Sequence, residues 1–165
     1  MFTEASLTET LKNIPWFFEL SSASFERLTS IAKLRDLPAG EVLFYEGERA
    51  DDFYIILLGQ IAIETQVPYH GCVCTFTAGA LDVVGWSCLT AFTRQRTSSA
   101  RAATDSRLVA MNGEALRRMC DEDHDLGYII MRRMTNIIAS HMLTTRLHLY
   151  DIIVQDNQMI QQHQA

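Results

Sequence analysis

The pattern of hydrophobic and polar positions divides the chain into three zones. Residues 1–33 form the first, in which apolar positions recur at helical spacing from Leu7 onward, with Ser22 or Ser24 as a candidate N-cap. Residues 34–111 instead hold short runs rich in β-branched and aromatic residues, separated by glycine and proline turn signals. These runs are EVLFY, DFYIILL, QIAIET, GCVCTFT, SSARAAT and RLVAM.

The third zone, residues 112–162, is helical again. Asn112 is a good N-cap for a short helix, and from residue 123 to about 162 the chain has almost no helix breaker. In this long helix Met142, Leu149 and Ile153 recur at near-heptad spacing. So long an apolar stripe exceeds what one small barrel covers, which predicts a dimerising helix; the alternative is a core helix that folds back.

Many short strands with glycine turns are typical of a sandwich or barrel. We therefore expect an α+β, mainly β fold. It is an eight-stranded β-roll (a jelly roll, or double-stranded β-helix) flanked by N-terminal helices and a long C-terminal helix.

Composition and charge narrow the functional classes. The net charge of −6 argues against a general nucleic-acid binder, which needs a basic face. No apolar run approaches the roughly 20 residues that span a bilayer, and the polar, acidic first residues contain no signal peptide. The four cysteines fit no zinc module, so we expect a cytoplasmic protein with reduced thiols.

One long segment, LPAGEVLFYEGERADDFYIILLGQIAI, resembles the cyclic nucleotide-binding domain family, which includes the bacterial catabolite activator proteins. The shared features are Pro38-Ala39-Gly40 before a strand, then Glu46-Gly47, then a strand that ends in the turn at Gly59. The segment of residues 100–119 is similar to the last two strands of the family and the helix that follows. The resemblance covers roughly residues 14–150.

Residues 83–102, VVGWSCLTAFTRQRTSSARA, are similar to the phosphate-binding cassette of this family. The resemblance implies that Gly85 opens a short helix whose amides, from Trp86 through Ser87 to Cys88, face a ligand. It also implies that Arg96 binds the phosphate and that Thr97 adds a hydroxyl. Because insertions here are hard to place, Arg94 is a register alternative to Arg96.

The cassette departs from the family pattern at one position. Where a glutamate would accept a hydrogen bond from the ribose 2′-hydroxyl, this chain has Trp86, whose indole can only donate. We therefore expect a stand-alone regulatory or sensor domain, not an enzyme, with weakened or altered cyclic nucleotide binding. The alternative is a ligand-free dimeric adaptor or scaffold whose pocket Trp86 fills.

The sequence identifies no cofactor with certainty: cAMP, cGMP or another small anionic ligand remain open. The expected partners are a second copy, bound through the C-terminal helix near Met142, Leu149 and Ile153, and a protein of unknown identity. The chain ends soon after the long helix, which leaves no room for a helix-turn-helix, so we expect no direct DNA binding.

The segment HGCVC places His70, Cys72 and Cys74 on one strand face, where a metal or redox site is conceivable. Neighbouring side chains on one face rarely converge on an ion, so packing in the core or in a hairpin is the favoured interpretation. No metal site is expected, and with His70 alone among the strands a cupin enzyme is unfavoured.

Overall fold

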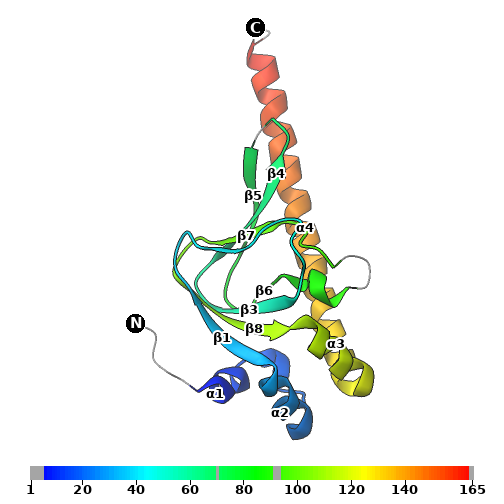
Figure 1. Cartoon of the computed structure of the whole chain (residues 1–165). Helices are drawn as coiled ribbons and strands as arrows, with labels where there is room; N and C mark the ends of the chain where they lie inside the picture. The colour runs from blue at the N-terminus through cyan, green and yellow to red at the C-terminus, as the bar shows by residue number, and fades with distance from the viewer. Residues whose placement is uncertain (1–5, 70, 91–93, 164–165) are drawn as a thin grey trace.

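The computed structural model describes residues 6–69, 71–90 and 94–163, in which a β-roll is flanked by helices at both ends of the chain (Figure 1). In chain order the elements are α1 (Leu7–Lys12), η1 (Pro15–Phe17), α2 (Ser22–Ser30), β1 (Ala32–Leu37), β2 (Val42–Phe44), β3 (Asp52–Leu58), β4 (Ile61–Val67), β5 (Gly71–Ala78), β6 (Val83–Val84), η2 (Trp86–Leu89), β7 (Ser99–Ala102), β8 (Ser106–Asn112), α3 (Gly113–Glu122) and α4 (His124–His163). The predicted eight-stranded roll with flanking helices is confirmed.

The eight strands form two four-stranded antiparallel sheets, ordered β1-β8-β3-β6 and β2-β7-β4-β5. Two of them, β1 and β6, have no counterpart among the runs that the sequence pattern indicated. The first helical zone also ends earlier than expected, because α2 is capped at Ile31 and Lys33 already pairs with Ala110 in β8. Gly59, at φ +88°, lies so close to the start of β8 that a Cβ there would approach the Cα of Ser106 to 2.7 Å.

Helix boundaries follow from capping hydrogen bonds. The Oγ of Ser21, rather than of Ser22 or Ser24, accepts from the amide of Ser24 at 3.1 Å and caps α2. Asn112 caps α3 as predicted, accepting from the amide of Ala115 at 2.9 Å. Asp123 separates α3 from α4 with extended backbone angles.

Strand β3 divides the interior into two hydrophobic clusters, because alternate side chains of a strand point to opposite faces. Phe53 and Ile55 belong to the cluster beneath the helices, whereas Tyr54 and Ile56 belong to the cluster inside the roll. The first cluster joins the sheet to the helices, and the second lines the space where a ligand could bind.

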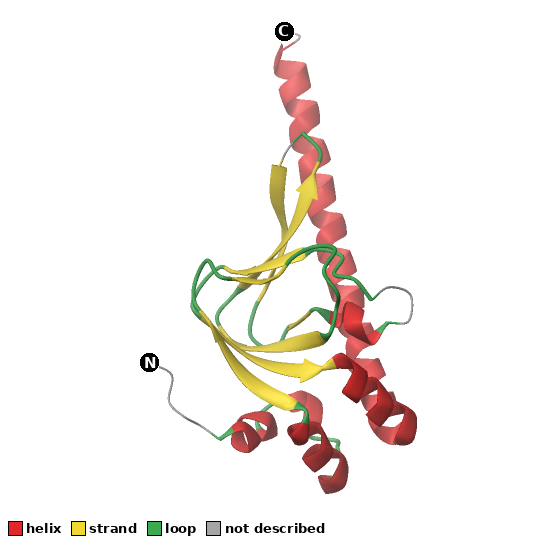
Figure 2. Cartoon of the chain, in the orientation of Figure 1, coloured by secondary structure: helices red, strands yellow, loops and turns green. Residues whose placement is uncertain are grey.

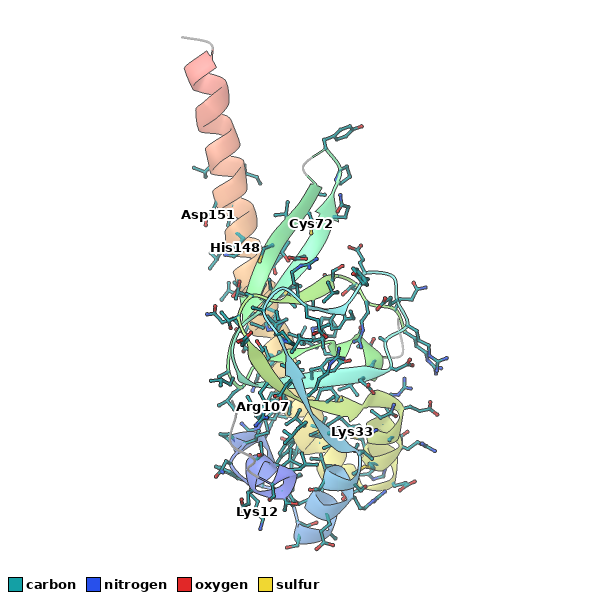
Figure 3. The ribbon with its side chains drawn as sticks, turned by 60° about the vertical axis from the view of Figure 1, so that its left-hand side comes forward. Lys12, Lys33, Cys72, Arg107, His148 and Asp151 are labelled. Atoms are coloured by element: carbon teal, nitrogen blue, oxygen red, sulfur yellow. The ribbon has the colours of Figure 1, made fainter. Side chains whose placement is uncertain are left out.

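The long helix α4 extends well beyond the roll, alongside the β4–β5 hairpin (Figures 1 and 2). The Nδ1 atom of His148 lies 2.8 Å from the carbonyl oxygen of Thr75, and Figure 3 shows His148 where α4 passes this hairpin. Several apolar side chains of this helix are exposed. They are Tyr128, Met131, Met142, Leu143, Leu147, Tyr150, Ile153 and Val154. Within the described residues, none of the helices could cross a membrane by length and apolar character.

Candidate ligand-binding site in the β-roll

The segment between β6 and β7 begins at Gly85, which takes a left-handed conformation at φ +78° and precedes the single-turn helix η2. A Cβ at this position would lie 2.5 Å from Nη1 of Arg96. Position 85 therefore requires glycine for two reasons, the left-handed backbone angle and the close approach of a guanidinium. The arginine side chain thus folds back onto the turn that opens its own segment.

Arg96 is a buried cation at the centre of this arrangement, with 5% of its surface exposed. Its Nη1 donates to the carbonyl of Gly85 at 2.8 Å, and its Nη2 donates to the carbonyl of Asp52 at 2.7 Å. The guanidinium lies 4.1 Å from the ring centroid of Phe44 and 5.9 Å from that of Tyr54. These contacts fix its position, whereas its Nε is buried without a hydrogen-bond partner.

A cavity of about 380 Å³ opens beside Arg96, within the size range of small-molecule sites. Its wall combines this cation with hydroxyl groups and with apolar and aromatic side chains, and contains no carboxylate among the described residues. The lining residues are Phe44, Ile63, Thr65, Thr75, Phe76, Val83, Val84, Gly85, Trp86, Ser87, Arg96, Thr97, Ser98, His141 and Thr145. Such a wall suits an anion that carries an apolar or aromatic body.

Helix α4 supplies one side of the cavity through His141 and Thr145. The imidazole of His141 packs on the ring of Phe76, with centroids 4.2 Å apart, and its Nε2 is buried without a partner. Burial lowers the pKa of His141 because it penalises the charged imidazolium. The same helix that carries the exposed apolar side chains therefore forms one wall of the cavity.

The structure brings together most of the residues that the sequence singled out. Gly85, Trp86, Ser87, Arg96 and Thr97 all line the cavity. The register alternative is settled by burial, since the side chain of Arg94 is exposed and only that of Arg96 enters the roll.

Cys88 is the exception among the cassette residues. Its side chain is 2% exposed and belongs to the hydrophobic cluster beneath the helices. The Sγ lies so close to Gly113 of α3 that a Cβ added there would be 2.6 Å away. Burial also raises the pKa of this thiol to about 12. The amide of Cys88 already donates to the carbonyl of Gly85 at 3.5 Å. Cys88 therefore packs the cassette against Gly113 of α3, and it is not among the residues that line the cavity.

Sequence reasoning missed the part of the wall that comes from other strands. Ile63, Thr65, Thr75 and Phe76 lie on β4 and β5, and only the pairing of these strands brings them to the cassette. His141 was missed because one histidine within a long helix gives no signal of its own. Thr145, on the same helix, gives no such signal either.

The three proposed dimer residues belong to α4. The side chains of Met142 and Ile153 are 70% and 48% exposed, while that of Leu149 lies outside the described residues. Cys72 and Cys74 lie in the β4–β5 hairpin, opposite Gln66 and Glu64, but both are exposed, so the expectation of core packing is wrong.

His70 lies outside the described residues. Among those the structure describes, no group of three or more histidine, cysteine, aspartate or glutamate side chains could hold a metal ion.

Comparison with known proteins gives a consistent result. The family model of the cyclic nucleotide-binding domain matches residues 34–123. A CRP-like cAMP-activated global transcriptional regulator of Mycobacterium tuberculosis is 28% identical over 151 residues, which is 91% of this chain. The chain spans 65% of the length of that relative.

Solved structures agree with this match. A protein of Geobacter metallireducens GS-15, solved as a cyclic nucleotide-binding protein, has a TM-score of 0.69 at 26% identity, covering 86% of this chain and 99% of its own. A cyclic nucleotide-binding domain of Methylobacillus flagellatus has a TM-score of 0.71 at 20% identity, covering 91% and 82%, and supports the fold alone.

Proposed function

The chain belongs to the cyclic nucleotide-binding domain family, and from this premise we propose that it is a regulatory, non-catalytic domain that binds a small anion inside its roll. The anion is a cyclic nucleotide or a molecule built like one. The observation that carries the proposal is the buried, fixed guanidinium of Arg96 beside an open cavity.

An anion in the cavity would balance the positive charge of Arg96. Two backbone carbonyls and an aromatic ring face the guanidinium, but no carboxylate lines the cavity among the described residues. A buried charge is costly unless paired, so an anion beside the guanidinium gains a charge-assisted interaction. The hydroxyls of Thr97 and Ser98, in the same wall, can donate to its remaining oxygens.

Trp86 supports the view that cyclic nucleotide binding is weakened. In the family pattern a glutamate at this place accepts from the ribose hydroxyl, and an indole cannot replace it. An unpaired hydroxyl in a dry pocket costs roughly 1–3 kcal/mol, which is about a 5-fold to 150-fold loss of affinity.

The competing function is a ligand-free adaptor in which Trp86 fills the pocket. Trp86 does pack against the hydrophobic cluster beneath the helices, which favours a partly structural role. A cavity of about 380 Å³ nevertheless lies beside the indole, and this favours ligand binding.

We also propose that two copies associate through α4 and that a further protein reads the change. The exposed apolar side chains of α4 extend from Tyr128 to Val154, a length that a second copy would cover by symmetry. Light scattering tests this: a species of twice 18.7 kDa supports the dimer, and a monomer at all concentrations contradicts it.

Calorimetric titration with cAMP and cGMP tests the ligand proposal. We expect micromolar or weaker binding that Arg96→Lys reduces, because a compact ammonium lacks the planar fork of donors with which the guanidinium reaches two separate carbonyls and an anion. Arg94→Ala, an exposed arginine two residues away, is the matched control and should bind as the parent does. Absence of heat with either nucleotide would favour the adaptor.

The variant Trp86→Glu provides a gain-of-function test. A carboxylate here should raise the affinity for cAMP by roughly 5-fold to 150-fold, but leave that for 2′-deoxy-cAMP unchanged. Equal gains for both nucleotides would show that Trp86 does not lie at the ribose.

A further inference from the structure

Besides Arg96, the cavity wall contains a second residue, His141, with a side-chain nitrogen that has no hydrogen-bond partner. Among the described residues, three buried side-chain nitrogens have no hydrogen-bond partner, and two of them, Arg96 Nε and His141 Nε2, belong to residues that line this one cavity. They come from different elements, the cassette and α4. Two residues that each carry an unpaired nitrogen therefore line one cavity, and this points to a shared occupant that interacts with both side chains.

The surroundings of His141 disfavour its charged form. Phe76 of β5 covers its ring, the cation of Arg96 lines the same cavity from the cassette, and burial holds its pKa below the ordinary value. Within the part of the chain that the structure describes, the charged group that favours the imidazolium is Asp82, before β6, and its Oδ2 already accepts from the amide of Gly79 at 2.8 Å. On α4 itself, the neighbouring His148 is exposed and bound to a backbone carbonyl of β5.

An anion changes this balance. It would offset the guanidinium of Arg96 and accept a hydrogen bond from a protonated imidazole, so the charged form of His141 becomes favourable once the cavity is occupied. Resting on the proposed function, we propose that His141 takes up one proton from solvent when an anion binds. The ligand is then held between Arg96 and an imidazolium, and binding strengthens as the pH falls.

The sign and size of the effect follow from linkage. Between the pKa of His141 in the empty protein and its higher pKa in the complex, binding takes up one proton, and the affinity changes by up to about tenfold per pH unit. Above both values the affinity is low and constant, and below both it is high and constant. A phosphodiester keeps a single charge throughout this range, so the ligand contributes no slope.

The experiment titrates the full chain with cAMP and cGMP between pH 5.5 and 8.0, in buffers of different ionisation enthalpy. We expect an affinity that rises several-fold toward acid with measurable proton uptake. In His141→Gln, whose side chain is polar but cannot be charged, the slope should vanish. His148→Gln is the matched control, on the same helix near the same strand, and should keep the slope. A slope that persists in His141→Gln, or binding without any slope, overturns the proposal.

A second measurement separates this proposal from the identity of the ligand. The pKa of His141 is followed by NMR with and without sulfate, a doubly charged anion across the same range, in the parent and in Arg96→Lys. If neither nucleotide binds but sulfate raises the pKa of His141 in the parent alone, the cyclic nucleotide proposal fails and the proton coupling stands. If neither nucleotide binds and sulfate leaves the pKa unchanged, the coupling is refuted too.

Discussion

Replacing Arg96 by alanine should destabilise the protein even without a ligand. The guanidinium joins three segments, because it donates to the carbonyls of Gly85 and Asp52 and stacks on Phe44. Each hydrogen bond from a charged donor contributes about 1.5–3 kcal/mol, and the ring contact adds about 0.5–2 kcal/mol. Burying the charge offsets part of this, so the expected loss of unfolding free energy is about 3 kcal/mol.

The assay is thermal and urea unfolding of the ligand-free chain, followed by circular dichroism. For a domain of this size, about 3 kcal/mol corresponds to a fall in the midpoint temperature of roughly 6–12 °C. Arg94→Ala is the control, because its side chain is exposed and its loss should change stability by less than about 0.5 kcal/mol. If the unfolding midpoints of both variants are close to that of the parent, Arg96 does not hold these segments together and is not a fixed anion site.

Three further predictions concern other parts of the molecule. Gly113→Ala should cost about 1–3 kcal/mol by overpacking, since its Cβ would lie 2.6 Å from a buried thiol, whereas Gly79→Ala meets open space and should unfold like the parent. Ile153→Asp on the exposed apolar face of α4 should convert a dimer to a monomer in light scattering, while the exposed Asp151→Asn should not. A hydrogen bond from a serine hydroxyl, and then one from a backbone amide, lower the pKa of Asp123, so its carboxylate stabilises the fold at neutral pH and this contribution is lost as pH falls through the lowered value. The difference in unfolding midpoint between the parent and Asp123→Asn should therefore be largest near pH 7 and disappear in acid; a constant difference would contradict it.

The roll could be anticipated from sequence because its central strands carry strong local patterns. The run DFYIILL is apolar on both faces, and it became β3, which contributes to both hydrophobic clusters. Strand β1 was not anticipated because AKLRDL mixes charged and apolar positions, and pairing with β8 decides its conformation. Strand β6 has only two residues, too few for any periodic signal.

The cassette side of the site was predictable for a similar reason. Gly85 and Arg96 lie within one short segment, and their order carries the resemblance. The opposite wall depends on strand pairing and on the rotation of α4, neither of which is encoded locally. This is why Phe76 and His141, which face each other across 65 positions of chain, could only be found in the structure.

Because the helical backbone is interrupted at Asp123, α4 can tilt as one rod about its first residues. The helix has 40 residues, which at about 1.5 Å per residue gives a rod roughly 60 Å long. A tilt of about 5° at its start would therefore displace the far end by roughly 5 Å, the rise of one helical turn. Because His141 lies less than halfway along the rod, a small shift of its ring against Phe76 is magnified at the C-terminal end. On such a pivot a shift at His141 is magnified a little more than twofold, so a displacement of about 2 Å at its ring would correspond to roughly 5 Å at the far end.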